Sequence, residues 1–446
     1  MALTTLEYCL DPFYTYMKVK DKNTHLLESS LKVKDTGNYS IIVFNPKEVI
    51  SYAGGKTYVE RDGNKAEVKE DILSTLDKII LEKKQLGTGL IFDGGFVGYL
   101  SYDYGMELMG VPRTNPNSFE IPDIYFGYYE DFVVIDHVDS KTYIYTDNEE
   151  IIEELKSLKD LEYPRKDIEG VKLTSNFTKE EFENRVKSVR DYIKKGDVYE
   201  VNIAQQYSGY GSVNPYDVYS TFRKVNRGPY NAFMDISEGN YILSTSPEQF
   251  IRKRGNILTT RPIKGTVPRV DDKDENERLK DYLYNSEKTR SELLMIIDLE
   301  RNDLSRVCIP GTVRVESLFD VEEYATVNHL VSTIAGDVSV DTTFGDIIRG
   351  TFPGGSITGA PKLRSLEVID ELESVSRGIY TGAIGYISNN GDFDFNIAIR
   401  TPVITNEGVF YSVGGGMVWD SDPEEEYEET LHKGKAINRS LTGKED

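Results

Sequence analysis

The sequence predicts an α+β fold in which large, mainly antiparallel β-sheets pack as a sandwich with helices outside. Three observations indicate this class. Short runs rich in β-branched and aromatic residues, such as residues 39–44 and 132–135, are bounded by Gly, Asn and Asp. Between residues 382 and 413, strand-like runs follow one another directly, which favours antiparallel pairing. Strands and helices alternate in the second half, but without the regular rhythm of a parallel sheet.

The N-terminal part of the chain is mainly strand-like. Residues 39–44, 98–102 and 132–135 are its clearest strand candidates. A charged stretch at residues 149–171, interrupted by Pro164 and Gly170, separates this part from the rest. We therefore expect an N-terminal region of residues 1–170 and a second region of residues 171–446, interwoven in one fold.

The second region begins with a well-marked helix. Thr178 and Glu181 form a capping box, apolar residues recur at helical spacing, and Lys195 with Gly196 marks the end. Further helices are predicted at residues 287–299, 342–349 and 361–372, and strands at residues 241–245, 382–387, 395–401 and 408–413. Both kinds of element therefore occur in the same region, as the α+β class requires.

The composition argues against several classes of protein. Of 446 residues, 39% are hydrophobic, which is enough for a sizeable core. The formal net charge of −23 argues against a nucleic-acid or anionic-membrane surface, because phosphate binding needs a basic field. The sequence has neither a long apolar run nor a secretory leader, so we expect a cytoplasmic protein without membrane contact. Neither Cys9 nor Cys308 lies in a glycine-flanked elbow, which argues against a thiol hydrolase.

The segment FPGGSITGAPK, residues 352–362, is rich in glycine and precedes a predicted helix. Its backbone N–H groups and the helix dipole are suited to a small anion. The Gly-Lys-Ser/Thr of a phosphate-binding loop is absent, however, because Gly359 is followed by Ala360, Pro361 and Lys362. A tight turn before a helix is an equally good interpretation.

An acidic run, DSDPEEEYEE at residues 420–429, begins another predicted helix, with Asp422 as its N-cap. Glu426, Glu429 and Lys433 fall on one helix face. Two carboxylates and a lysine on one face suit Mg²⁺ with an anionic ligand, since Mg²⁺ takes only one or two protein carboxylates. A solvated helix face is the alternative.

Three isolated residues are further candidates for chemistry. Glu292 lies beside an apolar stretch and is either paired or a ligand. Lys264, in RPIKGT, is either a surface charge or a desolvated nucleophile. His329 is embedded in apolar residues and is either a satisfied core histidine or an acid/base group. The residues alone leave these alternatives open.

Together these segments resemble the chorismate-utilising enzymes, a family that comprises the large components of anthranilate and aminodeoxychorismate synthases and the isochorismate and salicylate synthases. The matching stretches over residues 196–433 are GDVYEVNIAQ, STSPEQF, RPIKGT, ELLMIIDLERNDLSRV, YATVNHLVSTI, FPGGSITGAPKLR, YTGAIGYI, NIAIRT and GGGMVWDSDPEEEYEETLHK, in the family's order. GGFVGYLSYDYG near the N-terminus also fits, so the resemblance covers most of the chain.

Within the family, the details resemble the aminodeoxychorismate synthase branch. Lys264 stands where anthranilate synthases usually have Ala, and PYNAF at residues 229–233 is closer to this branch than the Pro-Tyr-Met form of the other. The alternative is anthranilate synthase component I. A third alternative is a catalytically weak tryptophan-sensing or scaffold protein, against which the complete set of Glu292, Glu429, His329 and Arg400 argues.

The resemblance implies roles for named residues. The catalytic residues would be Lys264, Glu248 and His329, with Glu248 protonating the departing 4-hydroxyl. The substrate-binding residues would be Thr266, Tyr380, Arg400, Gly414, Gly415, Gly416 and Lys433. The Mg²⁺ ligands would be Glu292 and Glu429, with Glu426 in the outer shell or as a further ligand.

The resemblance also implies a reaction. Lys264 would add at C2 of chorismate as the 4-hydroxyl leaves, and ammonia would then attack C4 and expel the lysine. The product would be 4-amino-4-deoxychorismate, the precursor of 4-aminobenzoate in folate biosynthesis. Because 446 residues suit one synthase unit, we expect ammonia from glutamine to come from a separate glutamine amidotransferase subunit.

Two positions differ from the residues usual in this family, and one further motif resembles a tryptophan-binding element. Glu200 stands where isochorismate and salicylate synthases have a water-activating Lys, which argues against water as the nucleophile. Thr289 stands where family members usually have an acid, which would alter a metal shell that relied on it. Glu28 and Ser29, in HLLES, with Pro229 and Tyr230 resemble the tryptophan-binding elements of anthranilate synthases. The alternative for these four residues is a structural strand contact.

Overall fold

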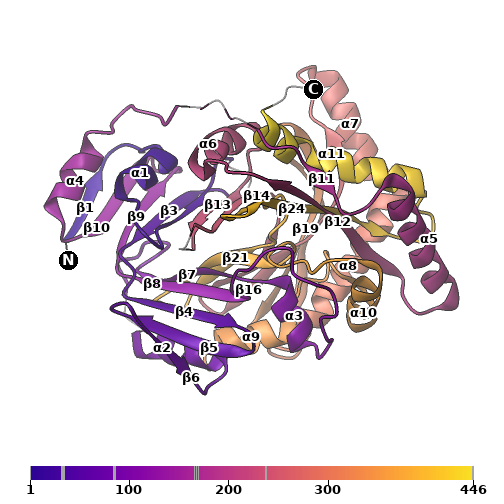
Figure 1. Cartoon of the computed structure of the whole chain (residues 1–446), viewed down its shortest axis with the longest axis horizontal. Coiled ribbons are helices and arrows are strands. Elements are labelled where there is room, and N and C mark those ends of the chain that lie inside the picture. Colours follow the sequence, from indigo (N-terminus) through magenta and orange to yellow (C-terminus); the bar gives the residue numbers. More distant parts are fainter. Residues whose placement is uncertain are drawn as a thin grey trace.

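The computed structural model describes residues 2–31, 36–83, 87–164, 166, 168, 170–236 and 239–443. Within these residues, two antiparallel sheets of twelve strands each form the body of the molecule, and helices lie around them (Figure 1). The strands of the first sheet are, in spatial order, β1 (Ala2–Leu6), β10 (Lys141–Thr146), β9 (Asp131–Asp136), β3 (Tyr39–Phe44), β2 (His25–Glu28), β13 (Tyr230–Asp235), β14 (Tyr241–Ser246), β23 (Val403–Ile404), β24 (Gly408–Met417), β12 (Glu200–Tyr210) and β11 (Thr174–Ser175), with β20 (Gly359–Ala360) also paired to β12.

The second sheet has the same antiparallel character. Its strands are, in spatial order, β17 (Ile263–Pro268), β19 (Val327–Asp337), β16 (Ile257–Arg261), β15 (Gln249–Arg254), β22 (Phe393–Asn396), β21 (Ala383–Ser388), β7 (Gly95–Leu100), β8 (Ile124–Tyr129), β4 (Glu48–Ala53), β5 (Lys56–Arg61) and β6 (Asn64–Val68), with β18 (Arg314–Glu323) also paired to β19. The helices are α1 (Pro12–Val19), α2 (Ile72–Lys83), α3 (Tyr102–Leu108), α4 (Glu149–Lys156), α5 (Lys179–Lys195), α6 (Pro215–Val225), α7 (Lys273–Asn285), α8 (Glu287–Ser305), α9 (Phe344–Thr351), α10 (Lys362–Leu372) and α11 (Pro423–Thr442).

The alternation of side chains along the strands explains the sandwich. On β13, Ala232 and Met234 pack with Tyr99 and Ile384 of the second sheet. Phe233, between them in sequence, belongs to the apolar cluster on the opposite face, under α1 and α6. Because successive strand residues point to opposite faces, one strand contributes both to the layer between the sheets and to the layer beneath the helices.

Helices cover the outer faces of both sheets. Apolar residues of α1, α4, α6 and α11 share one buried cluster with the first sheet. Those of α2, α8, α9 and α10 share another with the second sheet and β12, and Figure 1 shows α2 and α9 at the lower edge of the molecule. The predicted α+β sandwich with helices outside is therefore confirmed.

The two sheets join distant parts of the sequence. In the first, Leu26 pairs with Phe233, and in the second, Leu100 pairs with Ala383. Each sheet thus contains strands from both sides of residue 170. The division into residues 1–170 and 171–446 remains a prediction from the sequence.

Most predicted elements occur, with bounds that differ by a few residues. The capping box of Thr178 and Glu181 begins α5, and Gly196 ends it with φ 83°. Two strand predictions are wrong in part: the strand placed at residues 98–102 ends at Leu100, before α3 begins at Tyr102, and the strand placed at residues 395–401 ends at Asn396. The chain turns there, and Arg400 has a φ of 52°, outside the range that a strand allows.

Membrane-spanning helices are missing from the part of the chain that the structure describes, since none of its helices combines the necessary length with sufficient apolar character.

Candidate active site

A cluster of charged side chains lies where the beginning of β12 faces β17 of the other sheet. Its members come from distant parts of the sequence: Glu200 from β12, Lys264 from β17, Glu248 from the turn between β14 and β15, Glu292 from α8 and Glu429 from α11. In Figure 1, β12, α8 and α11 lie in the right half of the molecule. The fold therefore brings residues separated by more than two hundred positions into one electrostatic site.

Lys264 forms the centre of this cluster. Its Nζ lies 2.6 Å from Oε1 of Glu200, and the two side chains are 13% and 1% exposed. Burial lowers the pKa of the Lys264 ammonium, but the carboxylates of Glu200, Glu292 and Glu248 outweigh this effect and raise the pKa above its ordinary value. At rest, the lysine is therefore a buried cation paired with a carboxylate.

The close approach of Lys264 and Glu200 depends on a glycine in β24. A Cβ atom on Gly416 would lie 2.1 Å from Glu200 Oε1 and 3.0 Å from Lys264 Nζ. Any side chain at this position would displace the ion pair. This gives Gly416 a steric role in the cluster.

Glu248 has the properties of a general acid. Burial raises the pKa of its carboxyl group to about 7, although a hydrogen bond from Ser356 and the charge of Lys264 oppose the rise. The Ser356 hydroxyl donates to Glu248 Oε1 over 2.8 Å. Both protonation states are thus populated near neutral pH, which suits proton donation to a leaving group.

The glycine-rich segment at residues 352–362 positions Ser356. The Gly355 N–H donates to Glu300 Oε1 over 3.1 Å. The buried Lys362 ammonium binds Asp303, the Pro353 carbonyl of this segment and the carbonyl of Thr351 just before it. The amide that would bind an external anion is thus taken by a carboxylate of α8. Of the two interpretations of this motif, the contacts favour the tight turn.

His329 and Thr266 face each other across the β17–β19 pairing. Thr266 Oγ1 and His329 Nδ1 are 3.0 Å apart, and the same nitrogen is 3.3 Å from the Gly265 carbonyl oxygen. Burial, helped by the nearby Arg400, lowers the pKa of His329 to about 3, so the imidazole is neutral. Its Nε2 is buried without a hydrogen-bond partner among the described residues. One ring nitrogen therefore remains available to a ligand.

Arg400 is a partly buried cation beside His329. Its guanidinium donates to Asn226 Oδ1 over 3.1 Å, and no described carboxylate lies within ion-pair distance of it. Burial lowers the pKa of Arg400. A buried charge is stable only when it is paired or hydrogen-bonded, so this position is suited to an anionic ligand.

The face of α11 contributes an ion pair near the glycines of β24. Lys433 Nζ lies 2.6 Å from Glu429 Oε1 and donates to the Gly414 carbonyl over 3.0 Å. The charge of Lys433 lowers the pKa of Glu429. A Cβ on Gly415 would lie 3.5 Å from both Lys433 Nζ and Glu426 Oε2, so α11 meets β24 at this glycine.

The carboxylates fit a weakly held divalent cation better than a three-ligand metal cage. Burial and the charge of Glu429 raise the pKa of Glu292, although Lys264 opposes this, so the two carboxylates lie within each other's field. Glu426 accepts a hydrogen bond of 2.6 Å from Ser421, which engages one of its oxygens. Within the described ranges, no three His, Cys, Asp or Glu residues are close enough to hold a metal alone. Two carboxylates with substrate and water oxygens are, however, what Mg²⁺ commonly uses.

Two predicted positions have mainly structural contacts. Tyr380 is buried, and the Arg377 guanidinium lies 5.7 Å from the centre of its ring. Thr289 hydrogen-bonds to the N-cap Ser286 over 2.9 Å and packs against Gly265. Thr289 thus belongs to the capped first turn of α8, next to Gly265. The substrate-binding role of Tyr380 remains a prediction.

The functional assignments from the sequence omitted two side chains that the structure places in the cluster. In the sequence, Glu200 stands out only as a departure from a lysine, and Ser356 only as part of a turn. The available signal for Glu200 was a carboxylate inside the apolar run VYEVNIA, because a charge in a buried strand must have a partner. Nothing in the sequence identifies Ser356 as the partner of Glu248.

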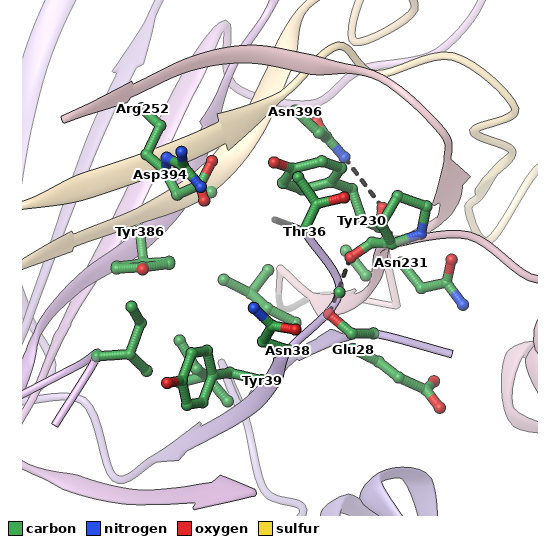
Figure 2. Close-up of a pocket in the computed structure, with 18 of the residues that line it drawn as sticks. Glu28, Thr36, Asn38, Tyr39, Tyr230, Asn231, Arg252, Tyr386, Asp394 and Asn396 are labelled. Atoms are coloured by element: carbon green, nitrogen blue, oxygen red, sulfur yellow. Dashed lines mark hydrogen bonds between the residues drawn. The ribbon is translucent and has the colours of Figure 1, made fainter. Parts of the chain in front are cut away.

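A separate cavity of about 180 Å³ lies between the sheets, where β2 and β13 face β21 and β22 (Figure 2). Leu27, Ile41 and Ile384 are among its apolar lining residues. Ser29, Pro229 and Tyr230 of the predicted tryptophan site also line it. Ser29 donates to the Pro229 carbonyl over 2.9 Å, and Asn396 to that of Tyr230 over 3.3 Å.

The polar groups of the cavity are suited to an amino acid. The side-chain oxygen of Asn38 is buried without a partner among the described residues and can accept from an ammonium group. Asn231 pairs with Glu28 across the strands, so its side chain lies with that of Glu28 on the other face of the first sheet. Glu28 lines the cavity but its carboxylate accepts from Tyr219 and Arg223, which belong to α6 on the other face of the first sheet. Of the four predicted residues, Glu28 therefore supports the wall and not the ligand.

The chain is similar to proteins of known activity. A family model described as chorismate binding enzyme matches residues 23–439. Aminodeoxychorismate synthase component 1 of Bacillus subtilis is 39% identical over 364 residues, which are 78% of this chain and 77% of that protein. The protein of the same name from Escherichia coli is 36% identical over 422 residues, 93% of this chain and 92% of that protein. The solved structure of anthranilate synthase component I from Streptococcus pneumoniae has a TM-score of 0.81 at 30% identity, and the match covers 96% of this chain and 98% of that one.

Proposed function

The chain belongs to the family of chorismate binding enzymes, and from this premise we propose that it is the large component of an aminodeoxychorismate synthase. In this proposal it replaces the 4-hydroxyl group of chorismate with an amino group from ammonia, with Mg²⁺ as cofactor. The product, 4-amino-4-deoxychorismate, leads to 4-aminobenzoate and folate. The names of the relatives from Bacillus subtilis and Escherichia coli support this choice within the family.

One observation carries the proposal: a buried lysine lies among carboxylates inside the site. Lys264 Nζ is held 2.6 Å from Glu200 Oε1. An amine becomes a strong nucleophile once it loses its proton, and this contact fixes where the amine lies. If the lysine occupies C2 of the ring, C4 is the carbon left for ammonia. This distinguishes amination at C4 from amination at C2.

Glu248 would supply the proton for the leaving group. Hydroxide leaves poorly, so the 4-hydroxyl must depart as water. With a pKa of about 7, the Glu248 carboxyl is protonated in a large fraction of molecules at neutral pH. Ser356 holds the carboxyl group by its hydrogen bond of 2.8 Å.

The addition can be written so that atoms and electrons balance. The Lys264 amine forms a bond to C2, the two ring double bonds shift by one position, and the C4–O bond breaks as Glu248 gives up its proton. Ammonia then bonds to C4, the double bonds return, and the C2–N bond to Lys264 breaks. Glu248 accepts the proton that ammonia loses, so the enzyme returns to its starting state.

The remaining charges would hold the substrate, which is a dianion. Arg400, without a carboxylate partner among the described residues, would bind the enolpyruvyl carboxylate with Lys433 and the backbone of Gly414 to Gly416. Glu292 and Glu429 would hold Mg²⁺, with Glu426 behind them. When bound, Mg²⁺ supplies Lewis-acid stabilisation of negative charge on the substrate. Thr266 and His329 would line the ring.

The experiment that tests the proposal is a product analysis. Purified protein is incubated with chorismate, Mg²⁺ and an ammonium salt, and the products are identified by mass and fluorescence. We expect 4-amino-4-deoxychorismate with its enolpyruvyl group retained. Anthranilate with released pyruvate would instead establish anthranilate synthase, the activity of the Streptococcus pneumoniae neighbour. No turnover at all would favour a binding or scaffold protein.

The source of ammonia defines a partner. We propose that a separate glutamine amidotransferase subunit supplies it, since the relatives are named component 1. Ammonium salts should therefore support turnover by the isolated chain, whereas glutamine should not until that subunit is added. Glutamine-dependent turnover by the isolated chain would contradict this.

We also propose that the cavity beside Tyr230 binds tryptophan. Its apolar residues suit an indole ring, and the unpartnered oxygen of Asn38 suits an α-ammonium group. Isothermal titration with L-tryptophan tests this directly. D-tryptophan serves as the control, because reversing the α-carbon moves the ammonium group away from this oxygen. Equal binding of the two forms would contradict the proposal.

A further inference from the structure

The carboxylate of Glu200 has one engaged oxygen and one that is not engaged. Oε1 accepts a hydrogen bond of 2.6 Å from Lys264, whereas Oε2 is buried without a hydrogen-bond partner among the described residues. The side chain is only 1% exposed. A buried carboxylate oxygen without a hydrogen-bond partner is unusual in a structural ion pair and has room to accept a proton. Glu200 is therefore poorly satisfied as a purely structural ion-pair partner.

Other groups around Lys264 are assigned to different tasks. Lys264 interacts electrostatically with four carboxylates: Glu200 on β12, Glu248 in the turn before β15, Glu292 on α8 and Glu429 on α11. Glu248 is engaged with Ser356, and Glu429 is paired with Lys433. Of these carboxylates, Glu200 is the one in hydrogen-bond contact with Nζ. It is thus placed to exchange a proton with the amine directly.

We propose that Glu200 is a catalytic residue that takes a proton from Lys264 before the amine adds to the ring and returns it when the amine leaves. This proposal rests on the covalent role of Lys264 in the proposed function. The Nζ–H proton moves to Glu200, and the freed electron pair forms the bond to C2. After ammonia has added at C4, the C2–N bond breaks and Glu200 returns the proton to the amine. The pair begins and ends each cycle in the same state.

Without an internal base, the same amine would depend on bulk solvent. Glu248 and Glu292 would still favour the charged lysine if Glu200 were neutral, and the dianionic substrate would favour it further. The site therefore does not release the proton unaided when substrate binds. Glu200 makes deprotonation of Lys264 a transfer within one hydrogen bond.

The first test uses the unaltered protein. It is mixed with chorismate and Mg²⁺ without ammonia, quenched at a series of times, and the adduct on the Lys264 peptide is quantified by mass between pH 6 and 8. With an internal base, the rate of adduct formation should change less than about threefold between pH 6 and 7 and fall towards pH 8, because Glu248 then loses the proton that it gives to the leaving group. A rate that rises about fivefold between pH 6 and 7 would overturn the proposal, because it would mean that the proton of Lys264 leaves to bulk solvent.

The second test compares two substitutions at the same position. Glu200→Gln keeps the shape and removes the base, and we expect adduct formation about 10²-fold slower than in the unaltered protein at pH 7, with the ratio of the two rates recovering as the pH rises. Glu200→Asp keeps a carboxylate, and we expect a rate within about tenfold of the unaltered protein with no recovery at higher pH. Adduct formation in Glu200→Gln at the unaltered rate would overturn the proposal.

These outcomes separate the proposal from the function on which it rests. A protein that aminates chorismate at C4 and forms the Lys264 adduct, yet is insensitive to Glu200→Gln, leaves the function intact and overturns the role of Glu200. A protein that forms no adduct overturns the covalent role of Lys264, and the role of Glu200 with it. If Glu200→Gln does not fold, the pH profile of the unaltered protein and Glu200→Asp decide the matter.

Discussion

The cavity beside Tyr230 and the cluster around Lys264 both lie where the two sheets face each other, yet they are built in opposite ways. The cavity is an open space of about 180 Å³ with both apolar and polar walls and an unpartnered amide oxygen from Asn38. The cluster is occupied by charges that neutralise one another, Lys264 with Glu200 and Lys433 with Glu429. A ligand can enter the first without breaking any protein contact, whereas it must replace ion pairs in the second.

This difference connects each structure with its proposed task. A preformed space binds a ligand of fixed shape at little cost, which suits a site that only has to hold something. Paired charges in a buried site are reorganised by an anionic substrate and its metal, so their full effect appears only with the substrate present. The predictions below alter the charged cluster first and the cavity last.

The largest effect is expected from Lys264→Met. It removes the proposed nucleophile, and turnover should fall by at least about 10³-fold. It also leaves Glu200 buried without its partner, so the free energy of unfolding should fall by about 3 kcal/mol. Turnover with ammonium salts and urea unfolding measure the two effects.

The matched control for Lys264→Met is the double variant Lys264→Met with Glu200→Gln. Removing the orphaned charge should restore most of the stability and none of the activity. Recovery of activity in the double variant would mean that the first loss came from misfolding.

Substitution of Glu248 should reduce activity, and titration of Glu248 in the unaltered protein should make activity depend on pH. Glu248→Gln should lower turnover by about 10²–10³-fold. In the unaltered protein, activity should fall as pH rises through about 7, because the carboxyl group loses the proton that it must donate. Ser356→Ala removes a hydrogen bond that favours the carboxylate, so the pKa should rise and this limb should move to higher pH by about one unit. A limb that moves to lower pH in Ser356→Ala would show that the limb does not belong to Glu248.

Substitutions of the carboxylates on α8 and α11 should weaken Mg²⁺ binding to different extents. If Glu426 belongs to the outer shell of the proposed metal site, Glu426→Gln should weaken Mg²⁺ binding by about 10–100-fold without abolishing it. Glu292→Gln should reduce binding further. Calorimetric titration with Mg²⁺, with and without chorismate, measures this, and Glu425→Gln on the exposed side of α11 is the control. Equal effects of Glu426→Gln and the control would remove Glu426 from the metal site.

The smallest effect on turnover is expected in the cavity. Ala232→Leu fills part of the space between the sheets, so it should abolish tryptophan binding while turnover with chorismate changes little. In the unaltered protein, tryptophan at about 100 times its Kd should add about 2.7 kcal/mol to the free energy of unfolding. Thermal unfolding with and without tryptophan measures the difference between the two proteins. The same gain in both would place tryptophan elsewhere.

The sequence predicts individual helices and strands far better than the tertiary contacts between them. Thr178, Glu181 and Gly196 define α5 because capping depends on neighbours in sequence. The strand predicted to reach residue 401 stops at Asn396. The backbone of Arg400 adopts a positive φ, and the conformational preferences of arginine do not predict this. Tertiary contacts decide such positions, and single-sequence patterns do not contain them.

The candidate site shows the same limit. The resemblance indicates roles for Lys264, Glu248 and Arg400, but it does not show which side chains they contact. Glu200 is a candidate for catalysis because β12 faces β17 in the fold, and Glu200 and Lys264 are far apart in sequence. The sequence indicates that a buried carboxylate needs a partner, but only the three-dimensional structure shows which residue that partner is.

The interleaving of the sheets has a consequence for synthesis on the ribosome. Strand β7 is buried on both faces and emerges about 280 residues before β21, whose Ala383 pairs with Leu100. At a translation rate of about 5–20 residues per second, the edge of β7 remains unpaired with β21 for roughly 15 to 60 s. A hydrophobic strand with an open edge is a site of aggregation during that interval. Slower initiation, which spaces the ribosomes on one message, should therefore raise the yield of native protein more than it raises total synthesis.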